Sequence, residues 1–251
     1  MKLYEKINFS GKIQDRFTEL AKYLFFNCYL LVRNQKFYFT DLEFYYYDKQ
    51  DPKFQDPFCL CQEDQQPGKP GYPFCFHKYG MDIIIGTRQA YGGTLIRGLK
   101  DETGHFIEGT QRLFTWILPL IDEKLIDEMY DMKKHAPLLK EAVKNKELQL
   151  VSNIIVPAKP VPMQQGPRVV GTRKEDKDLK FQLSPFRYLI DTDKYSYKPK
   201  EKIGYVTALL ADSPDQEKFK AMAEKRMKSS DAKTAKEWRT LVNYYEKLMA
   251  D

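Results

Sequence analysis

Cysteine is scarce in this chain: four residues in 251, at positions 28, 59, 61 and 75. A disulfide-stabilised scaffold is shorter and denser in cysteine, so we expect reduced thiols. No apolar run approaches the roughly 20 residues that span a bilayer, and the first residues lack the apolar segment of a signal peptide. These absences predict an intracellular protein of the cytoplasm or nucleoid, with no membrane partner.

Charge of neither sign dominates, and we find no internal repeat. Lysine and arginine number 41 against 35 acidic residues, a net charge of +6, which mildly favours a polyanionic partner. Hydrophobic residues make up 42% of the chain and aromatic residues 14%, ample for a core. The length suits one sizeable domain, or one domain with an appendage.

Apolar spacing predicts an α+β fold: a single domain with a curved antiparallel sheet flanked by helices. We expect a helix at 12–28, and strands within 29–47 that turn at Asn34-Gln35. Further strands at 74–100 turn at Tyr79-Gly80 and Tyr91-Gly92-Gly93. The rest is expected as a loop at 48–73, helices within 108–148, a Pro-rich connection at 157–168, strands at 169–190, and tail helices at 214–228 and 231–249. The chain therefore divides into a body, 1–191, and a basic helical extension, 192–251.

The run from Phe39 to Tyr47 carries the first candidate site residues. Read as a strand, it places Asp41, Glu43 and Tyr45 on one face and Leu42 and Phe44 on the other. A carboxylate beside aromatic rings on a rigid strand can hold a flat ring and direct a base at it. The alternative is an edge strand with a solvated acidic face.

Three motifs in order carry a resemblance to a known family: Asp41-Leu42-Glu43-Phe44-Tyr45, Tyr79-Gly80-Met81 and Leu95-Ile96-Arg97-Gly98-Leu99. They resemble the acidic strand, the wedge hairpin and the Leu-Leu-Arg-Ala-Leu strand of the alkyladenine (3-methyladenine) DNA glycosylases. The segments at 20–33, 166–171 and 179–182 resemble the family's opening helix and strand and its closing strands. The similarity covers residues 15–115 well and 165–190 loosely.

The resemblance implies a monofunctional DNA glycosylase that hydrolyses the N-glycosidic bond of a modified base flipped out of duplex DNA. Glu43 would be the general base and Arg97 its partner in holding the attacking water. Tyr45 and Phe76 would stack on the base. Tyr79 would be the intercalating wedge and Met81 its support. No cofactor is implied, the partner is double-stranded DNA with a modified base, and a monomer is expected.

Several positions depart from the family pattern. Phe54 stands where the family has a base-binding His, Gly86 where it has an Asn, and Phe76 where it has a Tyr. The stretch after Leu99 lacks the usual Gly-Pro-x-x-Leu segment. We therefore expect the scaffold and general base to be kept and the base-reading contacts to be changed. A different modified base and a loss of activity both follow from this.

Alternatives stay open at this point. The scaffold could be a catalytically inactive nucleic-acid or nucleotide-binding protein, or a glycosidase of a free nucleoside or nucleotide. Glu43 and Arg97 could form a structural ion pair, and the basic tail could track phosphates or be a solvated face. Two close pairs of soft ligands also form an alternative zinc set: Cys59 with Cys61, and Cys75 with His77.

Overall fold

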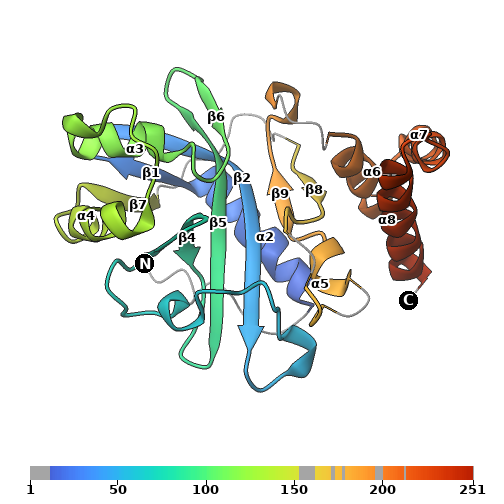
Figure 1. Cartoon of the computed structure of the whole chain (residues 1–251), viewed down its shortest axis with the longest axis horizontal. Coiled ribbons are helices and arrows are strands. Elements are labelled where there is room, and N and C mark those ends of the chain that lie inside the picture. The colour runs from blue at the N-terminus through green and yellow to red at the C-terminus, as the bar shows by residue number, and fades with distance from the viewer. Residues whose placement is uncertain are drawn as a thin grey trace.

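The computed structural model describes residues 12–152, 162–170, 173–176, 179–195, 200–211 and 213–250. Within them the fold is α+β, built on one antiparallel nine-stranded sheet (Figure 1). Its strands are β1 Cys28–Val32, β2 Gln35–Asp48, β3 Phe74–His77, β4 Gly80–Ile84, β5 Ala90–Asp101, β6 Phe106–Glu108, β7 Leu148–Ser152, β8 Gln164–Gly166 and β9 Arg187–Leu189. The main order is β3-β4-β5-β2-β1-β7, β6 adds to β5, and β9 joins β2 to β8. The predicted fold class is confirmed at this level.

Helices cover the sheet and extend one end of the molecule. The α-helices are α2 Ile13–Asn27, α3 Phe114–Ile121, α4 Met132–Lys144, α5 Lys180–Leu183, α6 Lys200–Leu210, α7 Gln216–Met227 and α8 Ala232–Ala250. Short 3-10 turns are η1 Pro52–Phe54, η2 Gln62–Gln65, η3 Glu123–Leu125 and η5 Thr192–Lys194. Helix α2 packs Phe17 between Phe44 of β2 and Phe186, with ring centroids 4.9 Å apart in each contact. These aromatic contacts fix the helix to the centre of the sheet.

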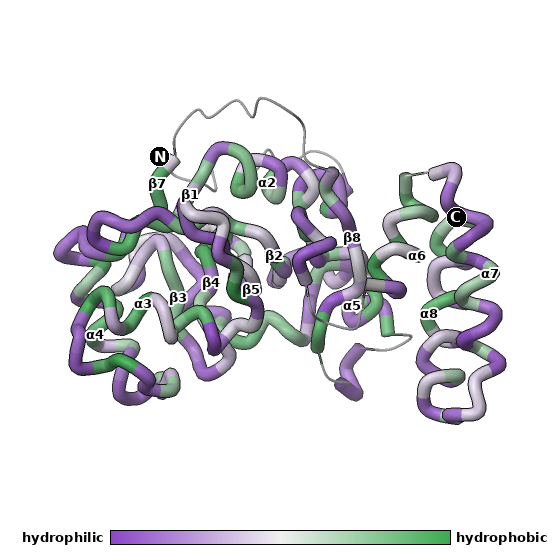
Figure 2. Tube along the Cα trace, turned by 90° about the horizontal axis from the view of Figure 1, so that it is seen from above, coloured by the Kyte–Doolittle hydropathy of each residue, from purple (hydrophilic) through white to green (hydrophobic). Residues whose placement is uncertain are grey.

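The C-terminal helices have a small core of their own. Tyr205, Trp238, Leu241 and Tyr245 are buried together between α6 and α8. Figure 2 shows α6, α7 and α8 grouped at the end of the molecule opposite α3 and α4. The group is tied to the body, because the Tyr245 hydroxyl of α8 donates to the Leu183 carbonyl (2.7 Å) and the Thr207 hydroxyl of α6 accepts from the Gln165 backbone N–H of β8 (2.9 Å). The division into 1–191 and 192–251 stays a prediction.

Strand β2 is central. One edge pairs with β5, and the other pairs first with β1 and then with β9. Asp41 and Glu43 are 1% and 0% exposed. The alternative of an edge strand with a solvated acidic face is therefore wrong, because both edges of β2 are occupied and its acidic face is covered.

Other expectations need smaller corrections. The first hairpin turns at Arg33-Asn34, one residue early, and Tyr91-Gly92-Gly93 lies inside β5 instead of in a turn. The closing strand expected at 179–182 is helix α5, and the strand is β9. Helix α6 was not predicted. Residues 157–161 of the Pro-rich connection lie outside the described residues, and β8 lies within the remainder.

Among the residues that the structure describes, no helix is both long enough and apolar enough to span a membrane.

Candidate functional site

A paired irregularity in β2 and β5 decides which side chains face the site. Three successive partners define the register here: Phe39 with Leu99, Asp41 with Gly98, and Leu42 with Ile96. Thr40 on β2 and Arg97 on β5 therefore have no partner residue in the β2–β5 ladder. Because each strand has one extra residue at nearly the same place, the two shifts cancel and the pairing continues unchanged beyond them.

The irregularity reverses the inward-facing positions of β2. The residues that join the main core are at odd positions before Thr40 and at even positions after it: Phe37, Phe39, Leu42, Phe44 and Tyr46. A regular strand would turn one of these two apolar groups to the opposite face. Asp41, Glu43 and Tyr45 consequently share that opposite face, as predicted. Arg97 on β5 joins them.

The Glu43 carboxylate is fully buried and has a donor on each oxygen. Its Oε1 accepts a hydrogen bond from the Tyr45 hydroxyl. Its Oε2 accepts from the backbone N–H of Val169 (3.1 Å) and lies 3.4 Å from Nη1 of Arg97. Burial opposes ionisation, but Arg97, Arg187 and the two hydrogen bonds outweigh it and lower the pKa of Glu43. The group is therefore a carboxylate at neutral pH.

Two further carboxylate–guanidinium pairs are buried beside Glu43. Asp41 accepts two hydrogen bonds from Arg187, at 3.0 and 2.6 Å. Asp56 accepts two from Arg168, at 2.5 and 3.1 Å. Both pairs have the bidentate geometry that suits arginine. Each buried charge is thus matched by a specific partner.

Arg168 also holds Tyr45 in place. Its guanidinium carbon lies 4.7 Å from the centre of the Tyr45 ring, a cation–π contact. The same group donates to the carbonyls of Phe44 (3.2 Å) and Phe181 (2.6 Å). Burial and the neighbouring Glu43 raise the pKa of Tyr45 well above its usual value. The Tyr45 hydroxyl therefore stays a donor to Glu43.

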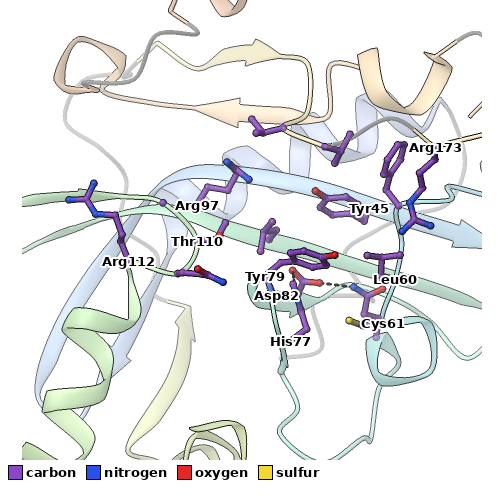
Figure 3. Close-up of a pocket in the computed structure, with 17 residues that line it drawn as sticks. Tyr45, Leu60, Cys61, His77, Tyr79, Asp82, Arg97, Thr110, Arg112 and Arg173 are labelled. Carbon is purple, nitrogen blue, oxygen red and sulfur yellow. Dashed lines mark hydrogen bonds and ion pairs between the residues drawn. The ribbon is translucent and has the colours of Figure 1, made fainter. Parts of the chain in front are cut away.

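A pocket of about 600 Å³ opens in front of these residues (Figure 3). Its wall includes Tyr45, Arg97 and Val169, each of which contacts Glu43. Glu43 itself is fully buried and is not part of the wall. In Figure 3, Arg97 and Tyr45 lie toward one end of the pocket, while His77, Asp82 and Cys61 gather at the other.

The second end of the pocket is also polar. Nε2 of His77 lies 3.1 Å from Oδ1 of Asp82. Oδ2 of Asp82 accepts from the Gln65 amide (2.6 Å), and Oε1 of Gln65 accepts from the Cys59 thiol (2.9 Å). Burial lowers the pKa of His77, but Asp82 outweighs it and raises the pKa to about 9. His77 therefore carries a proton at neutral pH.

The structure brings some of the predicted site residues together and separates others. Glu43, Arg97 and Tyr45 converge, and Tyr79 lies in the β3–β4 turn, 47% exposed, on the pocket wall. Met81 is buried in the main core beneath that hairpin.

Phe76 and Gly86 do not line the pocket. Phe76 lies in the main core, because the next residue, His77, faces the pocket and side chains alternate along a strand. The structure therefore does not offer it as a stacking wall. A Cβ at Gly86 would lie 2.1 Å from the Gln65 carbonyl, so backbone fills the place of a side chain there.

The four candidate zinc ligands do not form a metal site. Cys59 is bonded to Gln65, and His77 is paired with Asp82. Within the described ranges, no group of three or more His, Cys, Asp or Glu side chains could hold a metal ion.

Sequence reasoning did not assign roles to Asp56, Arg187, Gln65 or Asp82, and placed Arg168 only in a closing motif. Arg168 lies 112 positions from its partner Asp56, and Arg187 lies 146 positions from its partner Asp41. No local sequence pattern could reveal pairs so far apart. One signal was available for the strand irregularity: the apolar alternation of β2 breaks between Phe39 and Leu42.

Comparison with known proteins adds one distant relative. An uncharacterized protein of Acanthamoeba polyphaga mimivirus is 27% identical to this chain over 215 residues, which span 76% of this chain and 93% of the viral one. No protein-family model and no solved structure matches the chain. Function must therefore be argued from the site.

Proposed function

We propose that this protein is a monofunctional DNA glycosylase that hydrolyses the N-glycosidic bond of a modified base flipped out of duplex DNA. One observation carries the proposal: the buried Glu43 carboxylate is held by Arg97, Tyr45 and Val169, and these three residues line a base-sized pocket that also has the exposed Tyr79 on its wall. The curved sheet with flanking helices is compatible with the glycosylase-like fold that the motifs imply.

Hydrolysis of the N-glycosidic bond requires a fixed negative charge near the sugar and a group that accepts a proton from water. Breaking the bond between C1′ and the base nitrogen builds positive charge on the sugar, and water supplies the oxygen of the new bond. Glu43 stabilises that charge and takes the proton from the attacking water. Arg97 keeps Glu43 ionised and orients it. No step needs a redox cofactor.

Water reaches Glu43 by replacing a protein donor. Oε1 is occupied by the Tyr45 hydroxyl, whereas Oε2 has Val169 and Arg97. The Tyr45 bond is the one that can be exchanged, because Val169 donates through its backbone and Arg97 supplies the balancing charge. A bound sugar with its water then takes the place of that hydroxyl.

Tyr79 supports the DNA part of the proposal. It lies at the tip of a two-residue turn beside Lys78, with Lys78 Nζ 4.7 Å from the Tyr79 ring centre. An exposed aromatic ring at the tip of a hairpin can fill the space that a flipped nucleotide leaves in the stack. Lys78 and the pocket residues Arg112 and Arg173 supply positive charge for the phosphates.

The test is Glu43→Gln, assayed on duplexes that carry alkylated, deaminated or hydroxymethylated bases, with alkali cleavage at abasic sites as the readout. We expect wild-type release of at least one base and a loss of about 10²–10⁴-fold or more in the variant, because the amide cannot accept the proton. Glu102→Gln, on an exposed side chain, is the matched control and should keep full activity.

Two results would overturn the proposal. If wild-type protein releases none of these bases, the catalytically inactive binding protein or the nucleoside-acting glycosidase takes its place. If Glu43→Gln releases a base as fast as wild type, Glu43 is not the general base.

A further inference from the structure

A row of side chains crosses the pocket face of the sheet. Cys75 pairs with Asp82, Asp82 with Leu95, and Leu95 with Glu43. Adjacent strands lie about 5 Å apart, so the backbones of Asp82 and Glu43 are separated by two strand spacings, about 10 Å. The row therefore links the reacting end of the pocket to a second buried carboxylate across Leu95. A flat base that lies over Leu95 with its sugar at Glu43 points its far edge at Asp82.

The two atoms that meet this edge are short of partners. Nε2 of His77 and Oδ1 of Asp82 are buried, and neither has a well-directed hydrogen bond from the residues that the structure describes, although they lie 3.1 Å apart. Both side chains line the pocket. Buried polar atoms without such bonds are costly, and a ligand that supplies them recovers that cost.

The surroundings fix Asp82 in this position. Gln65 occupies its other oxygen and is itself held by Cys59. Space for this contact depends on Gly93, where a Cβ would lie 2.4 Å from Nε2 of Gln65 and 2.5 Å from Oδ2 of Asp82. A side chain at position 93 would push Gln65 or Asp82 out of this contact, and glycine leaves the space for it. Asp82 therefore presents one oriented oxygen, Oδ1, whose neighbour on the pocket side is Nε2 of His77.

We propose that His77 and Asp82 read the edge of the bound base, and that this edge carries a hydrogen-bond donor beside an acceptor. Asp82 Oδ1 accepts from the ring or exocyclic N–H, and His77 Nε2–H donates to the adjacent carbonyl oxygen or ring nitrogen. This deepens the proposed function and rests on it. The substrate class is a base whose pairing edge is intact and whose modification lies elsewhere on the ring.

The chemistry excludes bases whose edge is blocked or lacks the donor. Such a base would leave Asp82 facing a lone pair or an alkyl group in a buried site, which a hydrogen-bonding pocket rejects strongly. The raised pKa of His77 agrees with this role, since the protonated ring is a donor at neutral pH.

The experiment measures binding of three bases to the full chain by calorimetry or ligand-observed NMR. All three are used as their 9-methyl derivatives, because the free bases carry a ring N–H that is absent in DNA. Adenine and hypoxanthine then present a donor beside an acceptor on the pairing edge, whereas unsubstituted purine presents acceptors alone. We expect wild type to bind adenine or hypoxanthine roughly 10–100-fold more tightly than purine, the range for a hydrogen bond to a charged group. Asp82→Asn should remove this preference.

Asp48→Asn, near the end of β2 and outside the pocket, is the matched control and should keep the preference. Equal binding of all three bases to wild type, or a preference that survives in Asp82→Asn, would overturn the inference. The wild-type comparison decides even if Asp82→Asn does not fold. This binding experiment involves neither DNA nor turnover, so a negative result leaves the glycosylase proposal standing. If wild type shows the preference but releases no base from DNA, the pocket is a base-binding site without glycosylase activity.

Discussion

The two faces of strands β2 to β5 differ in polarity: one carries apolar side chains and the other carries charged ones. One face contributes Phe39, Leu42, Phe44, Ile83 and Ile96 to the main core. The other face carries Asp41, Glu43, Asp82, Arg97 and His77, nearly all buried and all in polar or ionic contacts. The same strands therefore supply both an apolar core and a dense layer of charge.

This contrast separates what stabilises the protein from what it can do. Burial of apolar side chains contributes directly to folding. Burial of ion pairs carries a desolvation cost that their attraction only partly offsets, and apolar replacements are often as stable. Buried titratable groups with shifted pKa values beside a pocket are typical of functional sites. The charged face is therefore better explained by chemistry than by stability.

The largest effect is expected from breaking a buried pair. Arg168→Met leaves Asp56 buried without its guanidinium, so the free energy of unfolding should fall by about 3–5 kcal/mol. Urea unfolding measures it. Arg226→Met, in an exposed pair with Glu201, is the control and should unfold like wild type. Adding Asp56→Leu to Arg168→Met should recover much of the loss. If the double variant were no more stable than Arg168→Met alone, an apolar replacement would not substitute for this buried ion pair, and the pair would be needed for stability.

The second effect concerns pH and belongs only to the charged face. The pKa of His77 rises from 6.5 to about 9 on folding. Its contribution, about 3 kcal/mol, is therefore fully present below pH 6.5 and is lost as pH rises through about 9. Urea unfolding between pH 6 and 9.5 should show this loss in wild type and a flatter profile in His77→Gln. His105→Gln, on the β5–β6 turn, should keep the wild-type profile. Identical profiles for wild type and His77→Gln would show that the His77–Asp82 pair stores no such energy.

A smaller effect tests the rim of the charged face. Tyr79→Ala should weaken binding to a duplex with an abasic-site analogue by roughly 1–3 kcal/mol, by analogy with aromatic stacking on single strands. Binding to undamaged duplex should change little, and so should stability, because the side chain is 47% exposed. Lys78→Ala should weaken both duplexes alike, since it removes charge only. Equal losses for Tyr79→Ala on both duplexes would remove the wedge role.

The smallest change adjusts Glu43 without removing its ion pair. The Tyr45 hydroxyl is one of the groups that lower the pKa of Glu43. Tyr45→Phe should therefore raise that pKa and move the acidic limb of the base-release profile to higher pH. The ring can still stack on Arg168, so the fold should be kept. An acidic limb that stays in place, or moves to lower pH, would mean that this hydrogen bond does not tune Glu43.

Much of the framework followed from local patterns. Helix α2, the hairpin strands β3 and β4, and helices α7 and α8 lie within a few residues of their predicted ranges, because hydrophobic periodicity reflects one buried face. The juxtaposition of Glu43 and Arg97 and the exposed tip at Tyr79 also followed from motifs. Strand β9 and helix α6 did not, since β9 is three residues long and is defined by its pairing with β2.

The sequence by itself determined the alternation that places Glu43 and Tyr45 together, and the turn that exposes Tyr79. These depend on neighbours one to four positions apart, where backbone geometry dictates direction. Only the tertiary structure decided that β2 is central, that Phe76 faces the core, and that Asp82 stands in line with Glu43 across Leu95. Each of these depends on strand pairing, and a register shift of one residue would turn every side chain of a strand to the other face. The register is fixed because both faces of the sheet are buried, and both faces are buried only in the fully folded chain.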